Sequence, residues 1–294
     1  MAIEIRPVHP DFVAEIGGID LSSPLVPEDR TAIASAIDAY AVVIFRGQTL
    51  DNDTQIAFAR NFGDPIPPAQ GVRHRGKKRL AQAEISDISN LDADNQLLER
   101  NARRRMDSLG NQLWHTDASF RAVPGALSML YAHVVPPKGG ETEFADLRAA
   151  YDALPEETRR SIDPLVAEHS IWTSRAWLGF TDYTDEERAQ VPPVPQRVVR
   201  LHPGSHRRTL YLAAHASHIL GWEVPEGRLL LRELMEHATQ REFTHRHHWQ
   251  AGDLVIWDNR CTMHRGRPHD PAEARDLRRV TTRDIASTLD QAVA

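Results

Sequence analysis

The chain has 294 residues, a formal net charge of −6 at pH 7 and an isoelectric point near 6.2. This balance provides no basic field for nucleic acid or an anionic membrane, and no apolar stretch reaches the roughly 20 residues of a membrane-spanning helix. The single cysteine, Cys261, excludes an internal disulfide or a thiolate metal cluster, and the residues after Met1 do not form a signal peptide. We therefore expect a cytoplasmic protein with one domain over residues 1–294 and with neither nucleic-acid nor membrane partners.

The first fifth of the sequence predicts a strand, a helix, a second strand and a second helix. Residues 29–40 alternate apolar and polar side chains at helical spacing, and residues 41–45 form an apolar run typical of a buried strand. Residues 53–62 place their apolar side chains on one helical face, with Asp51 or Asp53 as the N-cap.

A long basic loop is predicted at residues 65–82, which are rich first in proline and then in arginine and lysine. Loops of this length inside a compact domain are frequently lids or binding loops, and the alternative is a solvated surface segment. We expect the segment to border an active site.

The second half of the chain predicts many short strands and two helices. The helices are expected at 155–167 and 225–239, with Pro225 in the first turn of the second. The strands are expected at 127–135, 197–202, 210–213, 243–249, 253–258 and 279–283. Short strands with few helices favour a sandwich or a jelly roll, and the irregular order of elements argues against a doubly wound sheet.

His115 and Asp117 are the first candidate metal ligands in a chain with 15 histidines, which is a high count. Residues i and i+2 of a strand project to the same face, so the imidazole and the carboxylate would lie together. Chance alone supplies roughly one such motif in this composition. The similar run His9-Pro10-Asp11 is a decoy, because Pro10 excludes a central strand.

A third ligand must come from a distant histidine, and the best candidate is His264. It follows the apolar strand at 254–257, at the point where that strand gives way to a turn. With His115 and Asp117 it would complete a facial triad, which leaves three positions of Fe(II) open for a co-substrate and dioxygen. The alternative is a surface histidine in a loop.

Arg279, Thr281 and Arg283 share one face if this segment is extended. Two guanidinium groups inside a barrel require anionic partners, and an arginine binds a carboxylate bidentately. A dicarboxylate co-substrate and an anionic substrate would provide these partners. The alternative is an edge strand whose arginines point to solvent.

Residues 139–142 predict a hairpin turn. Gly139 and Gly140 form the turn, and Thr142 offers a hydroxyl group at the start of the next strand. Taken alone, this pattern indicates a turn and does not assign a function.

Four separated motifs now stand in a fixed order: Trp114–Asp117, Gly139–Thr142, Trp257–Arg260 followed by His264, and Arg278-Arg279 with Arg283. Together they resemble the taurine/2,4-dichlorophenoxyacetate dioxygenase family of Fe(II)- and 2-oxoglutarate-dependent oxygenases. The resemblance extends over nearly the whole chain and looks closest to the 2,4-dichlorophenoxyacetate branch. It implies a mainly β fold with flanking helices and a double-stranded β-helix core, which is a jelly-roll, cupin-like architecture.

The resemblance also implies the cofactor ligands. His115, Asp117 and His264 would bind Fe(II) and form the catalytic centre, while Thr142 and Arg279 would hold the distal carboxylate of 2-oxoglutarate. Dioxygen would take the remaining metal position.

Substrate residues are implied in the same way. Asn111 and Arg283 fall where family members line the substrate pocket, and His202 and His215 are further candidates, with hydrogen-bonded core histidines as the alternative. In the 2,4-dichlorophenoxyacetate branch, the loop after the segment that corresponds to Asn61-Phe62-Gly63 carries a lysine. In this chain Arg73 lies near that position. An arginine fork is not equivalent to an ammonium group, so the resemblance implies an anionic substrate without fixing a phenoxyacetate.

The implied reaction hydroxylates the carbon next to the ether oxygen of an aryloxyalkanoate, and 2-oxoglutarate is converted to succinate and CO2. The hemiacetal product would collapse to a phenol and an oxo acid. The same chemistry on an alkanesulfonate or sulfate ester is the first alternative. A zinc hydrolase would lack an evident general base, and a metal-free cupin-like binding protein would not need three ligands. We expect a small anionic organic compound as the partner, and a homo-oligomer.

Overall fold

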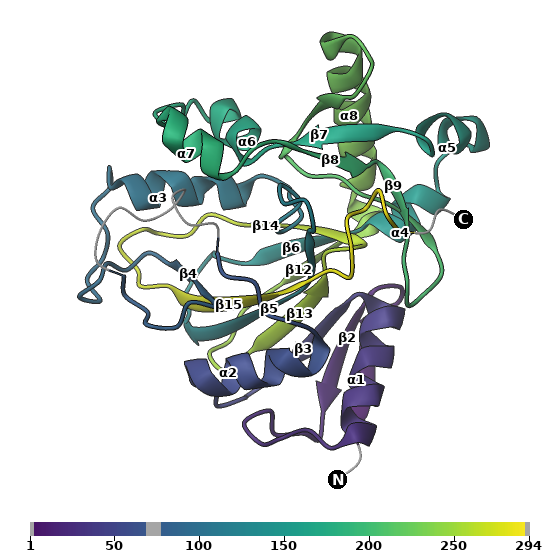
Figure 1. Cartoon of the computed structure of the whole chain (residues 1–294). Coiled ribbons are helices and arrows are strands. Elements are labelled where there is room, and N and C mark those ends of the chain that lie inside the picture. Colours follow the sequence, from purple (N-terminus) through teal and green to yellow (C-terminus); the bar gives the residue numbers. More distant parts are fainter. Residues whose placement is uncertain (1–2, 69–77, 292–294) are drawn as a thin grey trace.

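The computed structural model describes residues 3–68 and 78–291 (Figure 1). Within these residues, seven strands form the larger sheet in the order β1-β2-β3-β13-β5-β15-β4. Their bounds are β1 Glu4–His9, β2 Val13–Gly17, β3 Val42–Phe45, β13 Leu254–Asp258, β5 Gly125–Val134, β15 Asp276–Arg283 and β4 Ile85–Ser89. Neighbouring strands are antiparallel except β2 and β3. The central strands β3 and β13 are buried throughout, because both faces of the sheet are covered.

A smaller sheet covers one of these faces. Its strands are β12 Thr244–His247, β6 Thr142–Asp146 and β14 Thr262–Gly266, with β6 in the centre. Phe144 of β6 packs against Trp257 of β13, with ring centroids 5.5 Å apart. Two facing antiparallel sheets make a jelly roll, as the sequence predicts.

Helices α1 (Pro27–Tyr40) and α2 (Asn52–Ala59) cover the other face of the larger sheet (Figure 1). The side chains of Ile33 and Ile37 from α1 and Ile56 from α2 enter its core. The side chain of Asp51 accepts the backbone N–H of Thr54 and caps α2, which confirms one of the two predicted caps. The 3-10 turn η1 (Arg60–Phe62) follows, so both predicted N-terminal helices are confirmed.

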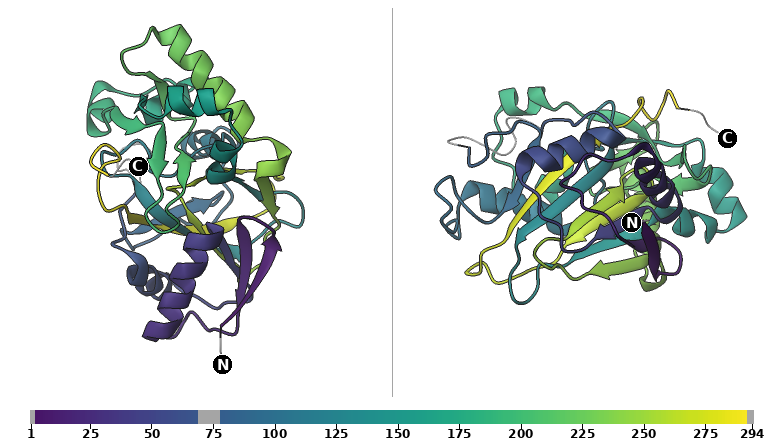
Figure 2. Two further views of the ribbon diagram at one scale, coloured as in Figure 1. Left: turned by 90° about the vertical axis from the view of Figure 1, so that its right-hand side faces the viewer. Right: turned by 90° about the horizontal axis from the view of Figure 1, so that it is seen from below.

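A second group of elements packs on the outer face of the smaller sheet (Figure 2). Ala145 of β6 and Met263 of β14 contact this group through a shared apolar core. Its elements are α4 Leu147–Asp152, α5 Glu156–Ile162, β7 Val166–His169, α6 Ile171–Trp177, α7 Asp185–Gln190, β8 Val194–Arg197, β9 Val199–Leu201, β10 Arg208–Leu210, β11 Ala216–Ile219, α8 Val224–Ala238 and the 3-10 turn η3 Arg241–Phe243. The central strand β6 of the smaller sheet is therefore buried throughout.

Several predicted boundaries were wrong. The helix expected at 155–167 ends at Ile162, because Pro164 cannot continue a helical hydrogen-bond ladder; Ala167 belongs to β7 instead. The strand expected at 197–202 is divided between β8 and β9, and the one expected at 210–213 ends at Leu210. The short helices α4, α6 and α7, and α3 (Arg103–Ser108) with the 3-10 turn η2 (Leu109–Gln112), were not predicted. Among the described residues, no helix has both the length and the apolarity needed to cross a membrane.

Candidate metal and co-substrate site

His115 and His264 lie opposite each other and are joined by a two-residue bridge. The backbone N–H of each residue donates to the carbonyl of the other, at 3.0 and 2.9 Å. His115 is extended at this single bridge and a turn begins at Asp117, so the strand expected here was wrong. His264 lies within β14 and not in a turn as predicted. The strand pairing of β14 with β6 positions His264, and the bridge then positions His115.

The three predicted ligands meet in a buried cluster. His115, Asp117 and His264 each offer one ligand atom, and these three atoms lie within 4.8 Å of one another. The distances from Asp117 are 3.8 Å from Oδ1 to His115 Nε2 and 3.7 Å from Oδ2 to His264 Nε2. The alternating extended backbone sends Thr116 the other way, where its hydroxyl donates to the Leu212 carbonyl. The geometry fits one metal ion bound by three side chains.

The protonation states suit metal binding. Burial lowers the pKa of His115 to about 4 and that of His264 well below 6.5, so both rings are neutral at pH 7. The Nδ1 atom of His115 lies 2.8 Å from the Leu113 carbonyl. A carbonyl only accepts, so Nδ1 carries the hydrogen and Nε2 is free to bind a metal.

Asp117 is oriented by a network of side chains. The Ser128 hydroxyl donates to Oδ2 at 2.7 Å, and Asn259 Oδ1 accepts the Asp117 backbone N–H at 3.1 Å. Asn259 also donates to Ser128. Arg279 Nη1 lies 2.6 Å from Oδ1. Burial alone would raise the pKa of Asp117, but Arg279 and the two histidines outweigh it and lower this pKa, so the carboxylate is ionised.

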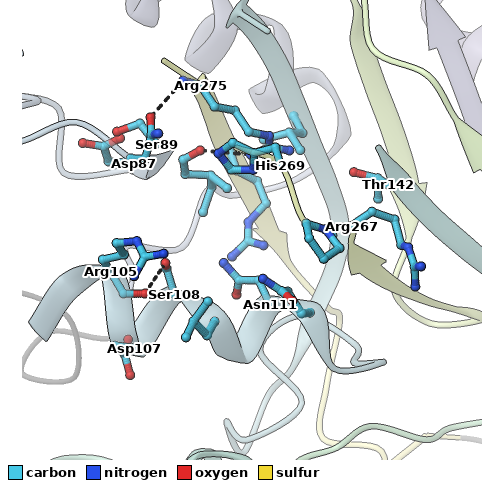
Figure 3. Close-up of a pocket in the computed structure, with 18 of the residues that line it drawn as sticks. Asp87, Ser89, Arg105, Asp107, Ser108, Asn111, Thr142, Arg267, His269 and Arg275 are labelled. Carbon is cyan, nitrogen blue, oxygen red and sulfur yellow. Dashed lines mark hydrogen bonds between the residues drawn. The ribbon is translucent and has the colours of Figure 1, made fainter. Parts of the chain in front are cut away.

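A cavity of about 270 Å³ opens beside the histidines (Figure 3). His115, His264 and Arg279 line this cavity, and Thr142 and Arg275 line it as well. Gly139 and Gly140 have positive φ of 76° and 74° and β6 begins at Thr142 as predicted, but the predicted hairpin is wrong, because the preceding strand β5 and β6 lie in different sheets.

Arg275 is a partly buried cation without an acidic partner among the described residues. Its guanidinium donates only to two backbone carbonyls, those of Ile88 at 3.3 Å and Gly140 at 3.2 Å. No carboxylate of the described residues forms an ion pair with it. Burial alone lowers the pKa of Arg275 to about 10, which still leaves it protonated at pH 7. A charged arginine in such a place favours an anionic ligand.

A smaller cavity of about 50 Å³ lies on the other side of Asp117. Its apolar wall includes Phe120 and Ile171, and Arg121 and Arg175 add positive charge. The residues shared with the larger cavity are Asn111, His115 and Arg279. The two cavities therefore meet at the candidate metal centre, and each contains an arginine besides Arg279.

Arg175 approaches this cavity past Gly110. An added Cβ at Gly110 would lie 2.0 Å from Arg175 Nη1, so a larger residue would displace the guanidinium. Arg175 Nε donates to Asp107 at 2.8 Å, and helix α6 is thereby fixed to α3, which precedes the turn that carries Asn111.

The other predicted substrate residues have different positions. Asn111 and His215 line the smaller cavity, and His215 Nδ1 lies 3.0 Å from Ser174 Oγ. His202 lines neither cavity, since it is a core histidine whose Nε2 is 2.9 Å from Asp258 Oδ2. Arg283 has an exposed side chain at the end of β15 and lines neither cavity. Arg73 lies outside the described residues.

Sequence reasoning missed Arg275, although a signal was present. Arg275 and Arg279 are four residues apart, so an extended backbone presents both on one face. The pairing of β15 with β5 changes register twice, between Asp276 and Leu277 and between Thr281 and Arg283, and the side chain of Arg283 at the end of the strand is exposed. The two arginines at the site are therefore Arg275 and Arg279, in place of the predicted pair Arg279 and Arg283.

Comparison with known proteins agrees with this geometry. A jelly roll with a buried two-histidine, one-carboxylate cluster defines the non-heme metal oxygenase class. Residues 4–281 match the family model described as taurine catabolism dioxygenase TauD, TfdA family. The chain belongs to this dioxygenase family.

Individual relatives match over their whole length. The chain is 49% identical to an alpha-ketoglutarate-dependent 2,4-dichlorophenoxyacetate dioxygenase of Cupriavidus pinatubonensis, covering 97% of this chain and 99% of the relative. It is 33% identical to an alpha-ketoglutarate-dependent sulfate ester dioxygenase of Pseudomonas putida, covering 96% and 89%. The crystal structure of AAD-2 in complex with Mn(II) and N-oxalylglycine superposes with a TM-score of 0.94 at 49% identity, covering 98% of this chain and 100% of that one.

Proposed function

We propose that the chain is an Fe(II)- and 2-oxoglutarate-dependent dioxygenase that hydroxylates a small anionic aryloxyalkanoate. The observation that carries this proposal is the buried cluster of His115, Asp117 and His264 at one end of a cavity that also holds the unpaired Arg275. Two neutral imidazoles and a carboxylate are suitable ligands for Fe(II). Bound Fe(II) would supply the oxidative chemistry that splits 2-oxoglutarate into succinate and CO2 and transfers one oxygen atom to a C–H bond.

Arg275 and Thr142 would hold the distal carboxylate of 2-oxoglutarate. This assignment replaces Arg279, which the sequence suggests for the role. Arg279 contacts Asp117 itself, whereas two methylene groups separate the chelating end of 2-oxoglutarate from its distal carboxylate. Arg275 lines the same cavity, and its hydrogen bonds go to the Ile88 and Gly140 carbonyls and not to a candidate metal ligand. Pairing with a carboxylate would satisfy its charge.

Arg279 would instead meet the acidic group of the primary substrate, because it lies where the two cavities join. Phe120 and Ile171 offer an apolar wall for an aryl ring. Pro67 and Pro68, from the predicted loop at 65–82, lie on the same wall and support the expectation that this segment borders the active site.

Hydroxylation of the carbon next to the ether oxygen would give a hemiacetal, which loses the phenol and leaves an oxo acid. The substrate class is supported by the 49% identity to the Cupriavidus enzyme. Oxidation of a sulfate ester is the alternative, supported by the relative from Pseudomonas putida at 33% identity.

The test is a panel of aryloxyacetates, aryloxypropionates and alkyl sulfates, assayed with Fe(II) by oxygen uptake and succinate release. We expect phenol and succinate in equal amounts from aryloxy acids. Turnover with Zn(II) alone would contradict the proposal. His115→Ala should abolish metal binding and activity with the fold retained, whereas His9→Ala, from the decoy motif, should leave both unchanged.

Three further expectations remain proposals. One domain over 1–294 is supported by the pairing of β3 with β13, which joins the two ends of the chain in one sheet. A homo-oligomer is supported by exposed apolar side chains near α8, among them Trp222 and Leu229. A cytoplasmic location is supported by the single buried cysteine, Cys261.

A further inference from the structure

The Thr142 hydroxyl has its direction fixed by a tryptophan. Trp249 Nε1 donates to Thr142 Oγ1 at 3.0 Å. An indole N–H can only donate, so the Thr142 oxygen must accept this bond and its own hydrogen must point elsewhere. Thr142 is 3% exposed and lines the larger cavity. Among the described residues, no acceptor receives the Thr142 hydrogen, so its donor capacity is available to a ligand.

Trp249 is itself held in one orientation. It follows β12 and packs against the apolar cluster between the two sheets, which includes Leu130 and Phe144. The His247 ring meets it edge to face, with centroids 4.5 Å apart. His247 Nε2 is in turn 3.1 Å from the buried carboxylate of Asp253. The indole N–H therefore points at Thr142 without help from a ligand.

We propose that Trp249 is a positioning residue that presets Thr142 as a hydrogen-bond donor to the distal carboxylate of 2-oxoglutarate. This inference rests on the proposed role of Thr142 and Arg275. An ionised carboxylate only accepts hydrogen bonds, and a hydroxyl that is free to rotate would present its lone pairs for part of the time. With its oxygen already occupied by Trp249, the hydroxyl offers only its hydrogen to the cavity.

The consequence is selectivity for an oxo acid with a distal charge. Trp249→Phe keeps an aromatic ring but removes the N–H group. Calorimetry on Mn(II)-loaded protein, without turnover, compares 2-oxoglutarate with 2-oxopentanoate, which has the same carbon chain but no distal carboxylate. We expect Trp249→Phe to weaken 2-oxoglutarate binding about three- to tenfold, the effect of one hydrogen bond, and to leave 2-oxopentanoate binding unchanged.

A double-mutant cycle shows whether Trp249 acts through Thr142. Thr142→Val should weaken 2-oxoglutarate binding, and adding Trp249→Phe to it should cause no further loss. Trp222→Phe, at a tryptophan that is 42% exposed, is the matched control and should bind like the wild type.

An equal loss of affinity for both oxo acids in Trp249→Phe would overturn the inference. It would also be overturned if Trp249→Phe weakened 2-oxoglutarate binding as much on the Thr142→Val background as in the wild type. Wild-type binding of 2-oxoglutarate by Trp249→Phe would overturn it as well. If Thr142→Val and Arg275→Met both bind 2-oxoglutarate normally, the underlying site assignment fails instead.

Discussion

Two buried arginines next to the same strand differ in the partners that surround them. Arg79 forms bidentate hydrogen bonds with both Asp87 and Asp276, at 2.6 to 2.9 Å. Burial alone would lower its pKa, but these carboxylates outweigh it and raise that pKa. Arg275, the neighbour of Asp276 in sequence, bonds only to carbonyl groups, and its pKa falls to about 10.

This difference separates a structural charge from a functional one. Arg79 has its counter-charges within the fold, so it joins β4 to β15 whether or not a ligand is bound. Arg275 carries the cost of a buried, unpaired charge, which an anionic ligand would relieve. A functional arginine can therefore be distinguished from a structural one because the fold provides no acidic partner for it.

The largest expected effect is on stability. Arg79→Met removes the cation that Asp87 and Asp276 share and leaves these buried carboxylates with Arg104 and Arg278 alone, so it should lower the free energy of unfolding by about 3 kcal/mol. Urea denaturation measures this change. Arg6→Met, which breaks an exposed ion pair with Glu15, is the control and should cost less than about 1 kcal/mol. A similar small cost for Arg79→Met would remove the distinction between the two arginines.

The next effect concerns the primary substrate. Arg279→Gln removes the guanidinium between the two cavities, and should raise KM for the aryloxy acid by at least about 30-fold. Steady-state kinetics at saturating 2-oxoglutarate measure it. Arg283→Gln, at the exposed end of the same strand, should change KM by less than about twofold. Equal losses in both variants would restore Arg283 as a substrate residue.

Acid stability provides a smaller test of the Arg79 cluster. Burial alone would raise the pKa of Asp276, but hydrogen bonds from Arg79 and Arg278 lower it from 3.8 to about 2. A lowered carboxylate pKa stabilises the fold above pH 4, and this contribution is lost as the pH falls from about 4 to about 2. Over that interval the wild type should lose about 1 kcal/mol more than Asp276→Asn, after allowance for solvent screening. Parallel stability curves for the two proteins would contradict the assignment.

The smallest expected effect on stability is at Arg275 itself. Without ligand, Arg275→Met removes an unpaired buried charge, and its free energy of unfolding should lie within about 1 kcal/mol of the wild type or above it. Thermal unfolding also separates the two proteins with ligand present: 2-oxoglutarate should raise the Tm of the Mn(II)-loaded wild type but not that of Arg275→Met. A loss as large as that expected for Arg79→Met would make Arg275 a structural residue.

Local patterns predicted much of the fold. Helical spacing located α1, α2 and α8, and apolar runs located β3, β5 and β13. The helices α4, α6 and α7 are six or seven residues long, too short for a periodic signal. Packing stabilises them instead: α4 contributes to the apolar core on the smaller sheet, and α6 to a separate apolar cluster with Tyr183 and Val191, which flank α7.

The site was predictable only in part, because its geometry depends on long-range pairing. The motif residues His115, Asp117 and His264 could be identified from the sequence, and the structure brings them together. Whether an arginine has an acidic partner depends on which strands are neighbours, as the pairing of β15 with β4 brings Asp276 to Arg79, whereas it brings no carboxylate of the described residues to Arg275. Trp249 follows β12 and reaches Thr142 on the neighbouring strand β6, and no spacing in the sequence indicates that contact.

The most direct test of the central claim is calorimetric titration of 2-oxoglutarate into the Mn(II)-loaded wild type, Arg275→Met and Arg79→Met. We predict that Arg275→Met binds at least about 100-fold more weakly than the wild type, because a buried carboxylate loses its charged partner. Folded Arg79→Met should bind within about threefold of the wild type. Wild-type affinity in Arg275→Met would contradict the account.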